Sequence, residues 1–151
     1  MQKLQIKSIV VTGTNGKSTT CKLIQHVLRT NKMDAKLGGN IGKPVLDLKI
    51  KKNSIIIIEA SSFQLSYSKC IKPSAAIILN ITKDHLDWHG TLKNYRNSKF
   101  NIFSNQDQKD FALLRDIDHI KKFKEKSFRS KVIKIPMNTS KKKFRKYIRN
   151  N

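Results

Sequence analysis

Residues 13–19 form a short glycine-containing stretch, GTNGKST, that could bind a phosphate group. The stretch follows a β-branched run and precedes an amphipathic segment, which is the layout of a phosphate-binding loop between a strand and a helix. Backbone N–H groups in such a loop converge on an anion, Lys17 adds a positive charge, and the Ser18 hydroxyl can hold Mg²⁺. The spacing is shorter than the common G-x-x-x-x-G-K-[ST] pattern, because Val11 stands where the first glycine would be. The candidate phosphate-binding residues are Gly13, Thr14, Asn15, Gly16, Lys17, Ser18 and Thr19.

Acidic and imidazole groups follow two other apolar runs and indicate a metal site. Glu59 comes directly after the run Ile55–Ile58, where a carboxylate beside a phosphate loop is a typical Mg²⁺ ligand. Asn80 ends the next apolar run and precedes His85 and His89. These two histidines would share a helix face, but no H-E-x-x-H zinc signature accompanies them. We favour His85 over His89 as a ligand, because His85 lies closer to the strand end.

Lys99 occupies an unusual place for a charged residue. In the helix expected around it, Lys99 lies on the inward apolar stripe that also contains Leu92, Tyr95, Ile102 and Phe103. It could simply extend along the stripe to solvent. Alternatively, it could point toward the phosphate site, where a desolvated lysine loses its proton easily and can be chemically modified. Periodicity alone leaves this choice open.

The elements that must position these residues alternate between strands and helices. Continuous β-branched runs are typical of strands buried on both faces of a parallel sheet. The sequence therefore predicts an α/β fold with a doubly wound, mostly parallel sheet and a phosphate loop, and ligands at the carboxyl ends of the strands. The expected strands are Ile6–Val11, Asp34–Gly38, Ser54–Ala60, Ala75–Leu79, Phe111–Leu114 and Val132–Ile135, and the expected helices are Lys17–Thr30, Thr91–Asn105 and Ile117–Phe123.

The chain of 151 residues is strongly basic, with a formal net charge of +22. Residues 121–151 alone carry 13 Lys and Arg and one acidic residue. A basic tail can bind nucleic acid, but no nucleic-acid motif accompanies it, so compositional bias with a solvated tail is the favoured explanation. We expect one domain over residues 1–135 and a basic, disordered tail over residues 136–151.

The remaining composition points to the cytoplasm. The two cysteines, Cys21 and Cys70, form neither a disulfide framework nor a zinc pattern. The amino terminus has no apolar core of a signal peptide, and Ile55–Ile58 is far too short to span a bilayer. We therefore expect a cytoplasmic protein without membrane association.

Four stretches together resemble the central domain of the Mur ligases: Thr12–Thr19, Gly38–Pro44, Glu59–Leu65 and Asn80–Gly90. The first is similar to the loop of the whole family and of folylpolyglutamate synthetases. The segments GGNIG and SSFQL resemble the members that add D-glutamate to UDP-N-acetylmuramoyl-L-alanine in peptidoglycan biosynthesis. The resemblance extends from about Ile6 to Leu114.

The resemblance implies an ATP-dependent ligase that forms an amide bond through an acyl phosphate. Lys17 would neutralise the β- and γ-phosphates of ATP, and Ser18 and Glu59 would hold one Mg²⁺. His85 and Lys99 would serve a second Mg²⁺, with Lys99 carbamylated by CO₂. The resemblance places two further residues, Asn40 and Ser61, near the acyl substrate.

Mur ligases have three domains, and the first and third have no counterpart in the matched stretches. The resemblance therefore implies a fragment, a truncated product or one piece of a split enzyme, with the other domains supplied by other chains. We expect weak binding of ATP and Mg²⁺ and no ligase turnover by this chain alone. The alternatives are another Mur-type or folylpolyglutamate ligase, or a basic nucleic-acid-binding protein that uses its tail.

Overall fold

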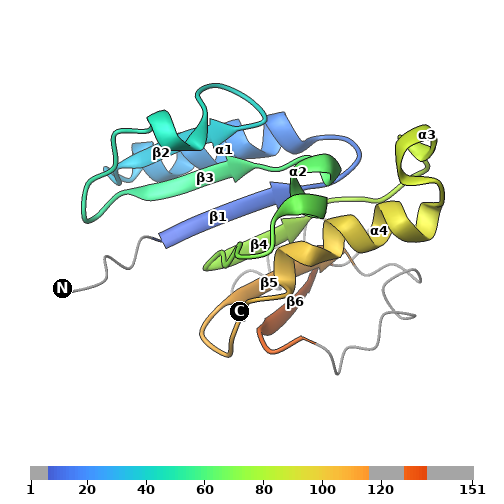
Figure 1. Ribbon diagram of the computed structural model, residues 1–151. Helices are drawn as coiled ribbons and strands as arrows, with labels where there is room; N and C mark the ends of the chain where they lie inside the picture. Colours follow the sequence, from blue (N-terminus) through green and yellow to red (C-terminus); the bar gives the residue numbers. More distant parts are fainter. Residues whose placement is uncertain (1–6, 116–127, 136–151) are drawn as a thin grey trace, which may run out of the picture.

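The computed structural model describes residues 7–115 and 128–135, which contain a parallel sheet with helices on both faces (Figure 1). Six strands lie in the order β2-β3-β1-β4-β5-β6, and every neighbouring pair is parallel. This confirms the predicted α/β doubly wound fold. The strands are β1 (Lys7–Thr12), β2 (Ala35–Gly39), β3 (Ile55–Glu59), β4 (Ala75–Ile78), β5 (Phe111–Arg115) and β6 (Lys131–Ile135).

The sheet buries one apolar cluster on each face, because successive side chains of a strand point to opposite sides. Val11 of β1 packs with Cys21 and Ile57, beneath α1 (Lys17–Thr30). Its neighbour Val10 belongs to the other cluster, with Leu65 and Phe100. That second face is covered by α2 (Ser62–Tyr67), α4 (Leu92–Phe100) and the 3₁₀ turn η2 (Asn101–Phe103). Figure 1 shows α1 and α4 on opposite sides of the sheet.

The predicted helix over 17–30 is confirmed, including its end. The Asn31 side chain donates to the Val27 carbonyl at 2.8 Å, and its backbone N–H also points back to the last turn. The helix expected over 91–105 is shorter, since the α-helical part ends at Phe100 and continues as the tighter η2. Thr91 caps α4 by accepting a hydrogen bond from the Asn94 N–H at 3.1 Å.

One sequence expectation about this core is wrong. Leu92 was placed on the inward stripe of α4 but is 37% exposed, because it lies in the first turn, beyond the edge of the packed surface. Cys21 and Cys70 are both free. The expected helix over 117–123 and the tail over 136–151 lie outside the described residues.

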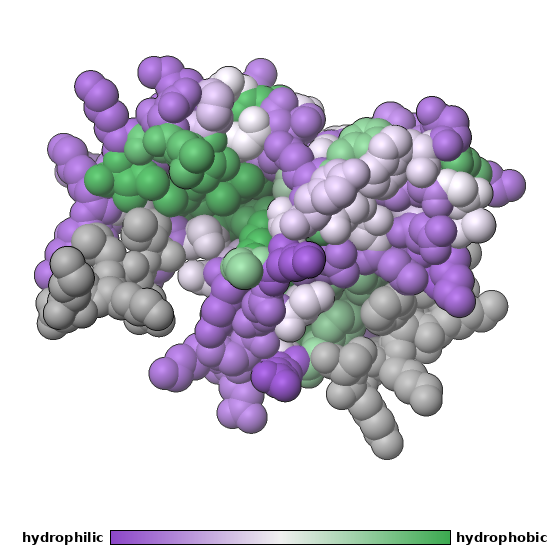
Figure 2. All heavy atoms as spheres, in the orientation of Figure 1, coloured by the Kyte–Doolittle hydropathy of each residue, from purple (hydrophilic) through white to green (hydrophobic). Residues whose placement is uncertain are grey.

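Figure 2 shows hydrophobic side chains gathered over η1 (Val45–Asp47) and the neighbouring part of β3, on the upper left of this face. Leu46 in η1 is 97% exposed. Within residues 7–115 and 128–135, no helix is long and apolar enough to cross a membrane.

Candidate active site

Three strands that are neighbours in the sheet bring the candidate residues together. The strand β1 lies between β3 and β4, so the segments that follow these three strands meet at one edge. After β1 the chain passes along one side of the sheet, and after β3 it passes along the other side. The edge at which these two connections diverge is the topological switch point. The phosphate loop follows β1, Glu59 ends β3, and Asn80 follows β4.

The phosphate loop is held in shape by its backbone conformation and by one side chain from another strand. Gly16 is the N-cap of α1 with φ of +82°, a left-handed conformation that glycine adopts without strain. The Asn80 side-chain oxygen accepts hydrogen bonds from the N–H groups of Thr14 and Asn15, at 3.1 and 2.9 Å. The Asn80 amide donates to the Asn15 carbonyl at 3.0 Å. The loop is therefore organised before any ligand binds.

Two lysine ammonium groups converge on one carbonyl of this loop. Lys17 Nζ donates to the Gly13 carbonyl at 3.0 Å and to the Thr14 carbonyl at 2.8 Å. Lys99 Nζ donates to the same Gly13 oxygen at 2.9 Å. Two positive charges at one neutral oxygen repel each other, and an anion placed between them would remove that repulsion. The pair is therefore suited to binding a phosphate group.

Lys99 is buried, with 1% of its surface exposed. Its ammonium lies 4.6 Å from the centre of the Tyr95 ring. The pKa of Lys99 is lowered from 10.5 to about 8, chiefly by burial and also by the charge of Lys17, while Asp84 acts in the opposite direction. Of the two interpretations open from the sequence, the structure selects the lysine that points to the phosphate loop. A measurable fraction of neutral amine near pH 8 also makes it a nucleophile.

Glu59 is a buried carboxylate without a cationic partner among the described residues. It is 2% exposed. One oxygen accepts from the Ser18 hydroxyl at 2.8 Å, and the other accepts from the Asn40 side-chain amide at 3.1 Å. A buried charge balanced only by neutral donors is costly, and a divalent cation would compensate it. Carboxylate and hydroxyl oxygens are the ligands that Mg²⁺ prefers, so Ser18 and Glu59 fit the predicted metal position.

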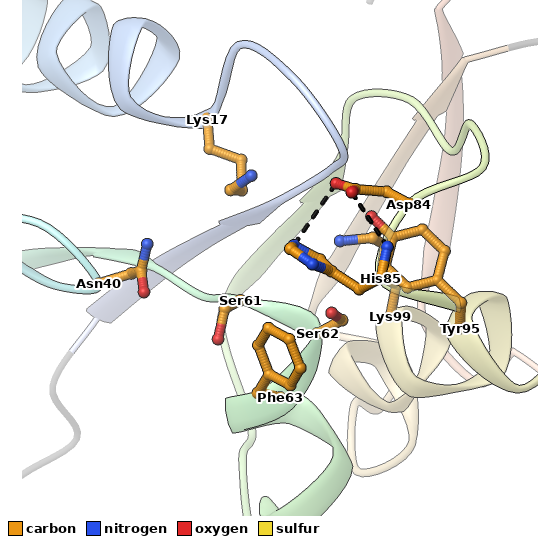
Figure 3. A pocket seen from close by; sticks show the side chains of 9 residues that line it. All are labelled: Lys17, Asn40, Ser61, Ser62, Phe63, Asp84, His85, Tyr95 and Lys99. Carbon is orange, nitrogen blue, oxygen red and sulfur yellow. Dashed lines mark hydrogen bonds and ion pairs between the residues drawn. The ribbon is translucent and has the colours of Figure 1, made fainter. Parts of the chain in front are cut away.

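A pocket of about 150 Å³ opens beside these groups (Figure 3). It is lined by residues that follow β1, β2, β3 and β4 and by residues of α4: Lys17, Asn40, Ser61, Ser62, Phe63, Asp84, His85, Tyr95 and Lys99. Ser61 caps α2 through a reciprocal pair of bonds with Gln64. Lys17, Asn40, Ser61, His85 and Lys99 were all predicted to lie at this site.

The structure places the two histidines of the sequence motif in different surroundings. His85 lines the pocket in a left-handed conformation, with φ of +50°, and its Nε2 lies 3.5 Å from an Asp84 carboxylate oxygen. His89 points away from the pocket and is buried between Ser62 and Ser98. In the part of the chain that the structure describes, no three His, Cys, Asp or Glu side chains cluster. A metal here would need the hydroxyl of Ser18 or a modified Lys99 among its ligands.

Sequence reasoning did not assign a role at the site to Asn80 or Tyr95, and it offered Asp84 only as part of a possible cluster of acids and histidines. The Tyr95 hydroxyl lies 3.1 Å from the Thr14 hydroxyl, so α4 contacts the phosphate loop directly. The position of Asn80 at a strand end was the one available signal, since polar residues at strand carboxyl ends face the ligand crevice. Nothing in the spacing of Tyr95 distinguished it from a core aromatic residue.

A parallel sheet with a phosphate loop at its switch point, a buried lysine and an unpaired carboxylate defines an α/β domain of the phosphate-loop class. Residues 11–151 match the Mur ligase middle domain. The chain belongs to the Mur ligase family.

The similarity to an individual relative agrees with this family assignment. A UDP-N-acetylmuramoylalanine--D-glutamate ligase from Natranaerobius thermophilus is 42% identical over 116 residues, which are 76% of this chain and 25% of the relative. The chain thus spans about a quarter of the length of that protein.

Two solved structures share the fold. The MurF ligase from Thermotoga maritima, in complex with ADP, superposes with a TM-score of 0.70 at 21% identity, over 89% of this chain and 33% of that protein. The E. coli protein FolC, in complex with DHPP and ADP, superposes with a TM-score of 0.63 at 15% identity, over 87% of this chain and 43% of that protein.

Proposed function

We propose that this chain is the ATP- and magnesium-binding part of a ligase that joins D-glutamate to UDP-N-acetylmuramoyl-L-alanine. The observation that carries the proposal is that the side-chain ends of Lys17 and Lys99 both lie at the phosphate loop, next to the buried carboxylate of Glu59. The name and 42% identity of the Natranaerobius relative support the choice of substrates. In the proposed reaction, the γ-phosphoryl group passes to the substrate carboxylate, and the amine of D-glutamate then displaces phosphate.

Lys17 and the first turn of α1 would bind the phosphates of ATP. The Lys17 ammonium exchanges its two carbonyl partners for phosphate oxygens, and free N–H groups at the helix start add their partial charge. Asn80 anchors the loop to the end of β4, because it accepts hydrogen bonds from the amides of Thr14 and Asn15. The loop contributes positioning and charge neutralisation, which are the main demands of phosphoryl transfer.

Ser18 and Glu59 would hold one Mg²⁺, and His85 and Lys99 a second. The metal ions supply charge neutralisation to the phosphates and the developing acyl phosphate. Lys99 fits this role only as a carbamate, and its lowered pKa favours the neutral amine that reacts with CO₂. We expect ¹³C-bicarbonate to give a carbamate carbonyl signal in the wild type that Lys99→Met abolishes; an identical signal in both proteins would exclude this modification.

Calorimetric titration of the 151-residue chain with ATP tests the nucleotide site. Lys17→Met should weaken MgATP binding about tenfold or more, as expected for the loss of a charged hydrogen bond. Glu59→Gln should remove the dependence of binding on Mg²⁺ while leaving ATP binding in EDTA unchanged. Lys22→Met, on the exposed side of the same helix, is the matched control. Absence of MgATP binding to the wild type, or equal losses in Lys17→Met and Lys22→Met, would refute the site.

The UDP-sugar substrate and D-glutamate require more binding surface than the pocket described above. Acyl substrate would contact Asn40 and Ser61, and we expect the rest of the UDP-sugar and amino-acid sites on further domains. The 151-residue chain should therefore bind MgATP without ligase turnover. Phosphate release by this chain that depends on D-glutamate would contradict that expectation.

A further inference from the structure

His89 joins the two walls of the pocket from behind without lining it. The residue ends α3 (Leu86–His89) and is 6% exposed. Its Nε2 lies 3.0 Å from the Ser62 hydroxyl at the start of α2, and its Nδ1 lies 3.3 Å from the Ser98 hydroxyl in α4. Ser62 itself lines the pocket, and Ser98 directly precedes Lys99. One imidazole therefore ties the α2 wall to the α4 wall.

The hydrogen bonds around His89 indicate which nitrogen carries its proton. The Ser98 hydroxyl donates to the Asn94 carbonyl at 3.0 Å. The Ser66 hydroxyl lies within hydrogen-bond distance of both the Ser98 hydroxyl, at 2.8 Å, and the Ser62 carbonyl, at 2.9 Å. With its hydrogen used in this way, Ser98 accepts from Nδ1–H of the imidazole. Nε2 is then unprotonated and accepts the hydrogen of Ser62. This arrangement satisfies both ring nitrogens and fixes the direction of the Ser62 hydroxyl.

The charge environment agrees with a neutral imidazole. Burial lowers the pKa of His89, the nearby His85 and Lys99 lower it further, and Asp87 acts in the opposite direction. Burial of an imidazolium between two serines would leave its charge without an acidic partner.

The aromatic packing around His89 extends to the pocket. Its ring stacks on Phe63, with centroids 5.6 Å apart and 24° between the planes. On another side it meets the edge of Tyr95 at 5.1 Å. Phe63 and Tyr95 both line the pocket, one from each wall. The imidazole thus sets the spacing between the two aromatic side chains as well as the orientation of Ser62.

We infer that His89 is a positioning residue, which holds Ser62 and Phe63 at a fixed place opposite Tyr95 and Lys99. The inference rests on the proposed function, because the group to be positioned is the terminal phosphoryl group of ATP or the acyl group that receives it. The side-chain hydrogen bonds of His89 go to Ser62 and Ser98 and not to the phosphate loop, which it reaches only through Tyr95. Loss of the link should therefore affect ligands that reach the pocket and spare those that reach only the loop.

Two substitutions separate the hydrogen bond from the volume of the ring. His89→Phe keeps a planar ring but has no acceptor for Ser62, whereas His89→Gln places an amide oxygen near the position of Nε2. We expect His89→Phe to lower the ratio of MgATP to MgADP affinity about fivefold, the effect of one lost hydrogen bond, and His89→Gln to restore it to within about twofold. The inference would be overturned if the ratio of MgATP to MgADP affinity were the same in the wild type and both variants. It would also be overturned if His89→Phe and His89→Gln lowered that ratio equally.

A second measurement keeps the inference separate from the proposed function. Long-range ¹H–¹⁵N spectra of the labelled 151-residue chain at neutral pH should show one histidine with Nδ1 protonated, absent in His89→Phe. Ser62→Ala should shift its Nε2 resonance. An Nε2–H tautomer would overturn the hydrogen-bond directions assigned above, and a charged ring or an unchanged spectrum in Ser62→Ala would overturn the link itself. Failure of the wild type to bind either nucleotide would instead refute the proposed function, and the tautomer measurement would still decide the link.

Discussion

Replacement of Lys99 by methionine should stabilise the fold at neutral pH although it damages the site. Burial lowers the pKa of this lysine from 10.5 to about 8. At about 1.4 kcal/mol per pH unit, the protonated lysine costs the folded state about 3 kcal/mol. Methionine removes that cost but also one hydrogen bond, of about 1 kcal/mol. The Gly13 carbonyl keeps its bond from Lys17, so no acceptor is orphaned. The expected net gain at about pH 7 is roughly 2 kcal/mol.

The pH dependence of this gain follows from the direction of the pKa change. Below about pH 8, Lys99 is protonated in both the folded and the unfolded state, and the full cost is present. Between about 8 and 10.5 the unfolded state binds more protons, so the wild type gains stability as pH rises. Above 10.5 the cost has disappeared. The advantage of Lys99→Met should therefore be largest near neutral pH and vanish at high pH.

Urea unfolding followed by circular dichroism, at a series of pH values from about 6.5 to 10.5, measures this difference. Lys93→Met on the exposed side of α4 is the control and should show no gain that declines with pH. A variant less stable than wild type at neutral pH would refute the reasoning. So would a difference between Lys99→Met and wild type that stays constant across the pH series. The same variant should bind MgATP more weakly, so stability and function change in opposite directions.

Two further substitutions test the framework of the site. Asn80→Ala should destabilise the protein by about 1–2 kcal/mol in urea unfolding, because the Asn15 N–H loses its acceptor, whereas the Thr14 N–H keeps the backbone carbonyl of residue 80; Asn80→Asp retains the acceptor and should recover most of this loss. Gly39→Ala should cost more than about 2 kcal/mol, since Gly39 has φ of +106° and a Cβ would collide with the Glu59 carbonyl. Gly90→Ala, at φ of +72° with open space around it, should cost only about 1 kcal/mol, and an equal effect of both glycine substitutions would contradict the steric argument.

Much of the fold was determined locally and could be predicted from the sequence. The run Ile55–Ile58 forms the buried part of β3, since β-branched residues favour extended backbone and apolar surface on both faces. The helix after the phosphate loop begins at Lys17 and ends at Thr30, as its periodicity and the following Asn31 indicated. The error at Leu92 arose because periodicity gives the direction of a side chain but not where the packed surface ends.

The site was determined in part by the sequence and in part by the tertiary structure. Residue types at or just after strand ends were sufficient to select Lys17 and Glu59 as candidate site residues, because parallel strands place their carboxyl ends at one edge of the sheet. The local pattern around Lys99 left two interpretations open. Only the packing of α4 against the sheet brings its ammonium to the Gly13 carbonyl.

The contact partners of Asn80, Tyr95 and His89 were decided by tertiary structure alone. Each is separated from its partner by many residues in the chain, and the contact forms only when the strand order places β4 beside β1 and α4 beside α2. A short motif specifies the phosphate loop because its hydrogen bonds are local. The walls of the pocket come from five segments of the chain, and the buried imidazole that joins two of these walls has no compositional signature. The sequence therefore predicted a phosphate loop, and the folded sheet decided which groups surround it.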